Sequence, residues 1–440
     1  MPTPRSVILF RIDAGSGTRS PWAEPSPMSC VGLMRETNRV AARLVATLAD
    51  VQTVTLRLRV FGLDVDVDVP AERAESIRSQ WAWCLPDSPA QRDIAPLPGA
   101  PELNDEPLTV TRGADGESDD HIADYNLTTS ITREAIGRRA AQFVMLHAGG
   151  VAEPETGRVA GLVAASGTGK TTATRHFCSR GYGYVSDESL IIGEARTVMP
   201  YPKPLSVVID PSEPYEKTQH DPGEVGLAFP PAGPLTLGPL VVLVRERGEE
   251  ASGDVARLEH IHLFDGLAQV LPQSSAMPEI PGSLDVLARL AQGGGGIHEM
   301  HYREIAETEH LLRRALALEP LEPFWRHVPG AWGDTSPYLP PEQFPVDPDR
   351  VAEGLEVERA RFVDALVDDE VMEAIVLLGA TPVRMSGLAT LVWDASAEPR
   401  DLEQLTAQCV AELGDHPDAT ALVQETLVQM LADGVLRPVE

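Results

Sequence analysis

VAGLVAASGTGKTTATRHF, residues 159–177, is the stretch around which the rest of the chain is organised. An apolar run leads into a turn that contains glycines, and a helical pattern begins near Lys170. A strand, a small-residue turn and a helix in this order predict a phosphate-binding loop. Small residues let backbone N–H groups approach an anion, and the helix start adds free N–H groups and a positive dipole end. The predicted fold class is α/β.

This loop supplies the predicted nucleotide contacts. Lys170 is spaced to reach the outer phosphates of a nucleoside triphosphate, and the hydroxyl of Thr171 or Thr172 is placed to ligate Mg²⁺. Ala164 stands where the usual pattern has its first glycine, so an easily reached positive φ is lost there. The alternative interpretation is a glycine-rich turn with an incidental lysine. The predicted nucleotide-binding residues are Ser166, Gly167, Thr168, Gly169, Lys170, Thr171 and Thr172.

Two adjacent carboxylates follow the next predicted strand, in GYGYVSDESLII, residues 181–192. Near a phosphate loop, one of Asp187 and Glu188 can accept the proton of an incoming hydroxyl while the other helps to hold Mg²⁺. A surface acidic turn is the alternative, since acidic residues are common in turns.

Two other polar side chains lie near these motifs in the sequence. His147 follows a helix predicted over residues 130–146, and it is either a structural histidine or a polar group beside the transferred phosphate. Lys203 lies between two prolines, in an extended segment. It contacts a phosphate or the acceptor, or it is a solvated loop lysine. Four further histidines form pairs without a matching third ligand, which favours surface positions over a metal site: His260 with His262, and His298 with His301.

Composition restricts the class of partner. The 440 residues carry 66 Asp and Glu against 36 Lys and Arg, a net charge of −30. Such a surface repels nucleic acid and anionic membranes, so neither is an expected partner. The four cysteines have no metal-like spacing, which is typical of reduced thiols, and we expect a cytoplasmic protein.

The chain divides into four segments. Residues 1–50 form an N-terminal segment of unknown role. Residues 51–325 form the main domain, whose first part alternates apolar and polar residues with a bend or bulge expected at Gly62, so it begins with an α+β region. Residues 326–350 form a linker rich in proline and aromatic residues. Residues 351–440 contain strands and two amphipathic helices, an outline typical of a small winged helix.

Four motifs in one order resemble HPr kinase and the wider group of HPr-kinase-like serine kinases. The resemblance covers about residues 120–320 and implies a P-loop kinase core that uses ATP and Mg²⁺. It also suggests a homo-oligomer. The motifs are LHAGGVA at 146–152, GLVAASGTGKTT at 161–172, GYGYVSDESLII at 181–192 and YPKPLSVV at 201–208.

The resemblance also assigns roles to particular residues. It implies catalytic roles for His147, Lys170 and Asp187, with Asp187 as the base, and metal contacts for Thr171 and Glu188. The family usually has two aspartates, so Glu188 is a longer ligand than the pattern expects.

The C-terminal segment resembles a second family. Residues 356–440 are similar to PqqD-type domains, which bind leader peptides of ribosomally made, post-translationally modified peptides; residues 382–394 resemble their strand followed by a helix, with Trp393 in the helix. Such domains add an extended peptide to a sheet edge.

Together these features predict a cytoplasmic ATP- and Mg²⁺-dependent kinase. It would phosphorylate a serine of a ribosomally made precursor peptide in natural-product biosynthesis, with the leader bound by residues 351–440. One alternative is a kinase of a small hydroxylated metabolite. Another is a nucleotide-sensing peptide carrier without kinase turnover.

Overall fold

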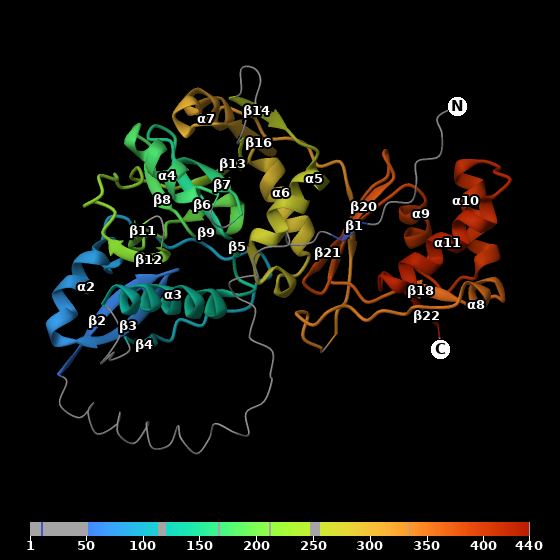
Figure 1. The fold of residues 1–440 in the computed structure, drawn as a ribbon, viewed down its shortest axis with the longest axis horizontal. Coiled ribbons are helices and arrows are strands. Elements are labelled where there is room, and N and C mark those ends of the chain that lie inside the picture. The colour runs from blue at the N-terminus through green and yellow to red at the C-terminus, as the bar shows by residue number, and fades with distance from the viewer. Residues whose placement is uncertain are drawn as a thin grey trace, which may run out of the picture.

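The protein has a mixed α/β fold with several sheets, as the sequence predicts (Figure 1). No helix in the described part of the chain has the length and apolar character needed to cross a membrane. Most of the N-terminal segment, and Ser166 and Gly167 of the predicted loop, lie outside the described residues. The computed structural model describes residues 10–11, 52–112, 120–165, 168–210, 213–246, 256–333 and 335–439.

A six-stranded sheet forms the centre of the larger unit, in the order β14-β16-β13-β7-β6-β8. The three middle strands β16, β13 and β7 run parallel, and β14, β6 and β8 pair antiparallel to their neighbours. Strands β7 and β13 are mostly apolar, as expected where both faces of a sheet are covered, whereas β16 also carries polar residues. The strands are β6 (Ala148–Ala152), β7 (Arg158–Val163), β8 (Gly183–Ser186), β13 (Thr236–Arg245), β14 (Arg257–His260) and β16 (Ile297–Tyr302).

Helices cover the two faces of this sheet. Helices α4 (Lys170–Ser179) and α7 (Glu309–Leu316) lie on one face, and α5 (Leu263–Val270) and α6 (Ser283–Gly293) lie on the other (Figure 1). Strand β7 shows why helices must cover both faces of the sheet, because its side chains alternate between two buried clusters. One cluster contains its residues 160 and 162 with α4 and α7, and the other contains residues 159 and 163 with α5 and α6.

Close packing fixes the start of α4 against the sheet. A Cβ added at Gly149 of β6 would lie 2.5 Å from Oγ1 of Thr174 on α4, so only glycine allows this approach. The helix N-terminus is therefore held at one position relative to the ends of β6 and β8.

The N-terminal α+β region packs beside the central sheet. Strands β2 (Thr53–Val60) and β3 (Leu63–Pro70) form an antiparallel hairpin. Phe61 and Gly62 have φ values of 52° and 69°, so the expected bend at Gly62 is a tight two-residue hairpin turn. The remaining elements of this region are α2 (Ala74–Gln80), β4 (Leu108–Thr111) and α3 (Asp120–Arg139). A later hairpin of β11 (Leu205–Asp210) and β12 (Glu213–His220) packs against α3.

The helix expected over residues 130–146 lies earlier in the chain. Helix α3 runs from Asp120 to Arg139, Ala141 takes a φ of 63°, and Val144–Leu146 form strand β5. All three residues of β5 are buried, which decides in favour of a strand over continued helical periodicity. Strand β5 joins a second sheet with β9 (Leu190–Ile192), β10 (Val198–Met199) and β15 (Ser274–Ser275).

The C-terminal unit contains a five-stranded sheet in the order β1-β21-β20-β19-β17, with helices packed on it. Residues 326–350, expected as a linker, contribute strand β17 to this sheet and the start of α8. The elements are β1 (Phe10–Arg11), β17 (Arg326–Pro329), α8 (Pro348–Ala352), β18 (Val357–Arg359), β19 (Asp364–Asp368), β20 (Glu373–Leu378), β21 (Thr381–Ser386), α9 (Leu388–Ala395), α10 (Leu402–Leu413), α11 (Ala419–Ala432) and β22 (Leu436–Pro438).

This unit is docked on the larger one. Leu366 and Ile375 lie in the same buried cluster as the apolar residues of α5 and α6. Oδ2 of the buried Asp364 accepts hydrogen bonds from the backbone N–H groups of Leu284 at 2.8 Å and Asp285 at 3.2 Å, in the first turn of α6. A carboxylate is a favourable partner for the free N–H groups of a helix start. The two units therefore share a core and a helix cap.

Candidate functional site

The described residues between β7 and α4 lead into the helix through a left-handed glycine. Gly169 precedes α4 with a φ of 109°, in the left-handed region that favours glycine. Ala164 takes no positive φ, so alanine fits at this position without backbone strain. Thr168 Oγ1 donates to the carbonyl of Ala165 at 2.5 Å. The loop thus leads directly into the N-terminus of a ten-residue helix.

Lys170 opens the helix and folds back over the loop. Its Nζ donates to the carbonyl oxygen of Ala164 at 2.6 Å, and its side chain is buried. Burial lowers the pKa of Lys170 to about 8, although the charges of Glu188 and Asp187 act in the opposite direction. The amine therefore lies against the backbone at the end of β7, bound to a carbonyl oxygen.

A local turn places the acid pair at the end of β8. Oγ of Ser186 accepts the backbone N–H groups of Glu188 at 3.2 Å and Ser189 at 3.1 Å. Serine hydroxyls stabilise turns in this way. Asp187 then lies beside the first turn of α4, where Thr171 Oγ1 donates to its Oδ2 at 3.1 Å. Two residues that the sequence predicted separately are in direct contact.

The other oxygen of Asp187 is held by two buried side chains. Oδ1 accepts a hydrogen bond from the hydroxyl of Tyr184 at 3.0 Å and lies 3.3 Å from Nζ of Lys203. Asp187, Tyr184 and Lys203 are all buried. The carboxylate therefore has a single orientation, with Oδ2 directed at Thr171.

Lys203 is an internal cation. Its side chain is fully buried, its Nζ lies 3.1 Å from Oε2 of Glu188, and it donates to the carbonyl of Pro204 at 3.1 Å. Burial by itself lowers the pKa of Lys203, but the charges of Asp187 and Glu188 outweigh it and raise that pKa above its ordinary value.. Neither sequence interpretation of Lys203 described this role, a buried ion pair with both members of the acid pair.

His147 lies close to the charged residues of this site but is itself neutral. It occupies the turn between β5 and β6, and its backbone N–H donates to the carbonyl of Gln273 at 2.5 Å. Burial and the charge of Lys170 lower the pKa of His147 to about 4. At neutral pH an imidazole in this position carries no charge, so it can offer one donor and one acceptor but no cation.

The depressed pKa of His147 predicts an acid-sensitive fold. The unfolded chain binds the proton near pH 6.5 and the folded chain only near 4, so stability is complete above pH 6.5 and is lost as the pH falls toward 4. We expect protonation of this histidine to lower the free energy of unfolding by about 2 kcal/mol between pH 7 and pH 5. Urea unfolding of the wild type and His147→Gln at both pH values checks it. Equal losses in the two proteins would contradict the prediction.

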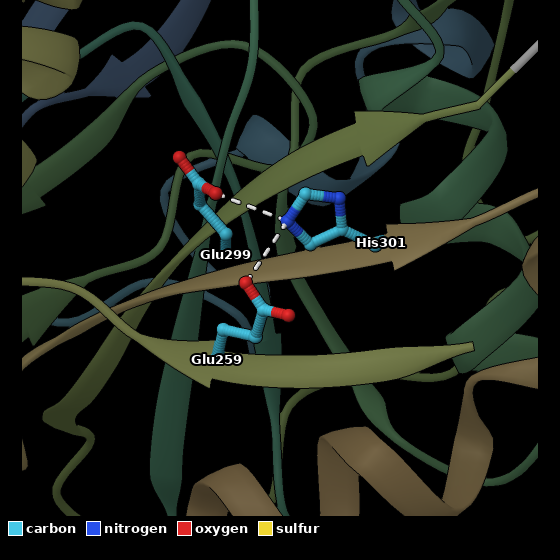
Figure 2. Close-up of side chains that lie close together, drawn as sticks. All are labelled: Glu259, Glu299 and His301. Carbon is cyan, nitrogen blue, oxygen red and sulfur yellow. Dashed lines mark hydrogen bonds and ion pairs between the residues drawn. The ribbon is translucent and has the colours of Figure 1, made fainter. Parts of the chain in front are cut away.

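A second charged cluster lies on the opposite face of the sheet. Figure 2 shows His301 between two carboxylates, with its Nε2 at 3.0 Å from Glu299 and 3.7 Å from Glu259. Gln269 of α5 donates to Glu299 at 2.7 Å, and Arg257 donates to Glu259 at 2.6 Å. The sequence paired His301 with His298, whereas the structure pairs it with glutamates on two adjacent strands. Because a guanidinium and an amide already bind these carboxylates, the cluster forms an ion-pair network.

Comparisons with known proteins give little beyond this geometry. No family model and no curated protein matches the chain. Among solved structures, the HPr(Ser) kinase/phosphatase from Coxiella burnetii matches with a TM-score of 0.22 and 12% sequence identity, over 39% of this chain and 95% of that chain. A TM-score this low does not establish a shared fold.

Proposed function

We propose that the chain is a phosphotransferase that moves the γ-phosphoryl group of ATP, with Mg²⁺, to a serine hydroxyl of a ribosomally made precursor peptide in natural-product biosynthesis. The observation that carries the proposal is the 3.1 Å hydrogen bond between Thr171 and Asp187, beside the buried amine of Lys170. A lysine, a hydroxyl and a carboxylate at one helix N-terminus are the parts that P-loop enzymes use for phosphates and Mg²⁺.

The residues present fit this metal and this nucleotide. Mg²⁺ prefers oxygen ligands and is usually bound through one or two carboxylates plus substrate phosphates. Thr171 and the acid pair offer such oxygens, and bound Mg²⁺ would neutralise charge on the phosphates. The backbone at the start of α4 and the amine of Lys170 would bind the phosphates themselves. Contacts from Ser166, Gly167, Thr168, Gly169 and Thr172 remain predictions.

The charges of the site are balanced before substrate arrives. Two carboxylates, Asp187 and Glu188, lie with two lysines, Lys170 and Lys203, and His147 adds no charge at neutral pH. A triphosphate then brings new negative charge, which Lys170 and the metal would offset. This preorganised arrangement is the main contribution a protein makes to phosphoryl transfer.

We propose residues 351–440 as a PqqD-like, winged-helix leader-binding domain. Strand β21 lies next to the edge of its sheet, where the chain's own β1 pairs with it antiparallel, Phe10 opposite Arg384 and Arg11 opposite Val383. This pairing supports an edge that accepts an extended peptide, whose backbone hydrogen bonds would give affinity. Because the unit is docked through Asp364, a bound leader would be held at a fixed position relative to the kinase site.

The leader-dependence of turnover tests this proposal. We expect a precursor peptide to be phosphorylated with a kcat/KM about 10²-fold higher than the same peptide without its leader, mainly through KM. Labelled ATP, Mg²⁺ and peptides encoded beside the gene are the reagents. Transfer to a small hydroxylated compound with no effect of the leader would favour a metabolite kinase. ATP binding without transfer would favour a nucleotide-sensing peptide carrier.

A further inference from the structure

The two carboxylates of the acid pair have different surroundings. The side chain of Asp187 is 4% exposed, whereas that of Glu188 is 28% exposed. They share one cation, since Lys203 lies within 3.3 Å of Asp187 and 3.1 Å of Glu188. One carboxylate is thus enclosed by the protein, and the other is open to an incoming molecule.

Both oxygens of Asp187 are engaged inside the protein. Tyr184 and Lys203 hold Oδ1, and the hydroxyl of Thr171 donates to Oδ2. A serine hydroxyl would have to share Oδ2 with Thr171, on a side chain that is only 4% exposed. By contrast, a threonine of the loop and an acidic residue after the next strand together form the usual Mg²⁺ position of P-loop enzymes. The surroundings of Asp187 suit a metal-holding residue.

Among the described residues, only one oxygen of the Glu188 carboxylate has a partner, whereas both oxygens of Asp187 have one. Its ion pair with Lys203 uses Oε2, and in the part of the chain that the structure describes Oε1 makes no hydrogen bond. The buried Lys203 binds one oxygen of the carboxylate, so the other oxygen also has a defined position. A proton acceptor must lie within hydrogen-bond reach of the hydroxyl that it deprotonates, and exposure makes this reach available.

We infer that the two carboxylates have the reverse of the roles predicted from the sequence. Asp187 holds Mg²⁺ together with Thr171, and Glu188 is the base. The assignment rests on the proposed function. As the serine oxygen forms a bond to the γ-phosphorus, its proton passes to the carboxylate of Glu188. The bond from the γ-phosphorus to the bridging oxygen breaks, and its electron pair leaves with ADP. Lys203 is the positioning residue for both carboxylates.

Metal-dependent nucleotide binding separates the two roles without relying on turnover. The probe is a fluorescent, non-hydrolysable ATP analogue, titrated with Mg²⁺ and with EDTA. We expect Asp187→Asn to lose the gain in affinity that Mg²⁺ gives the wild type. Glu188→Gln should keep that gain within about twofold while transfer of phosphate from ATP to peptide falls by about 10²-fold or more. Glu194→Gln removes an exposed carboxylate elsewhere and serves as the charge-matched control.

The assignment would be overturned if Glu188→Gln lost the gain in nucleotide affinity that Mg²⁺ gives and Asp187→Asn kept it. Glu188→Asp guards against a folding artefact, because it keeps the charge and should retain the Mg²⁺ gain with part of the transfer rate. If the wild type binds the analogue and transfers phosphate but the two variants show the opposite pattern, this inference is refuted and the proposed function stands. A wild type that binds no analogue refutes the proposed function as well.

Discussion

Lys170→Met is expected to lower the rate of phosphate transfer by about 10³-fold, the upper end of what loss of one preorganised donor costs. Nζ is buried and lies 2.6 Å from the carbonyl of Ala164, and the proposed function gives it the phosphates as partners. Methionine keeps the length and apolar stem of the side chain but removes the charge. Initial rates of transfer from labelled ATP, at several ATP concentrations, give the change in kcat and KM.

Arg175→Met is the matched control for this substitution. Arg175 lies on the exposed side of the same helix, α4, so its replacement removes a positive charge without touching the loop. We expect the control to stay within about twofold of the wild type, because an exposed charge is screened by solvent and salt. Equal losses in Lys170→Met and Arg175→Met would mean that overall charge, and not the loop lysine, determines the rate.

Lys203→Met is expected to destabilise the fold by about 3 kcal/mol, because removing one partner of a buried ion pair leaves an uncompensated charge. The side chains of Lys203 and Asp187 are 3% and 4% exposed, so solvent screens their interaction little. The same change should remove most of the transfer activity, since both carboxylates lose the cation that positions them. Urea unfolding, with an unchanged dependence of free energy on urea, measures the stability loss.

A double-mutant cycle identifies the cause of this loss. In Lys203→Met with Asp187→Asn, the buried aspartate charge is removed together with its partner. We expect the double variant to be more stable than the sum of the single changes predicts, by about 1 kcal/mol or more, since the two residues are in contact. Additive effects would show that Lys203 stabilises the fold through packing of its stem alone, and they would contradict the ion-pair account.

Local patterns predicted the elements around Lys170. Strand β7 and helix α4 occur in the order that the sequence indicates, whereas the contact between Thr171 and Asp187 was not predicted. The reason is that helix starts and strand ends are set by neighbouring residues, such as Gly169 and Ser186, whose conformations and hydrogen bonds are local.

Features that depend on distant packing were not predictable in this way. Lys203 lies in an extended proline segment, and nothing near it in sequence indicates burial beneath the acid pair. Residues 144–146 continue a helical pattern but are buried as a strand. The docking of the C-terminal unit depends on Asp364 capping a helix that begins about eighty residues earlier. Each case is decided by contacts between remote segments, which override local preference.

The most direct test of the central claim is transfer of labelled γ-phosphate from ATP with Mg²⁺ to serine-containing peptides. Each peptide is compared with a copy in which alanine replaces the serine, and the wild type is compared with Lys170→Met. The proposed function predicts label on the serine peptides alone, formed by the wild type and nearly absent with the variant. ATP binding by the wild type with no label on any peptide would contradict it.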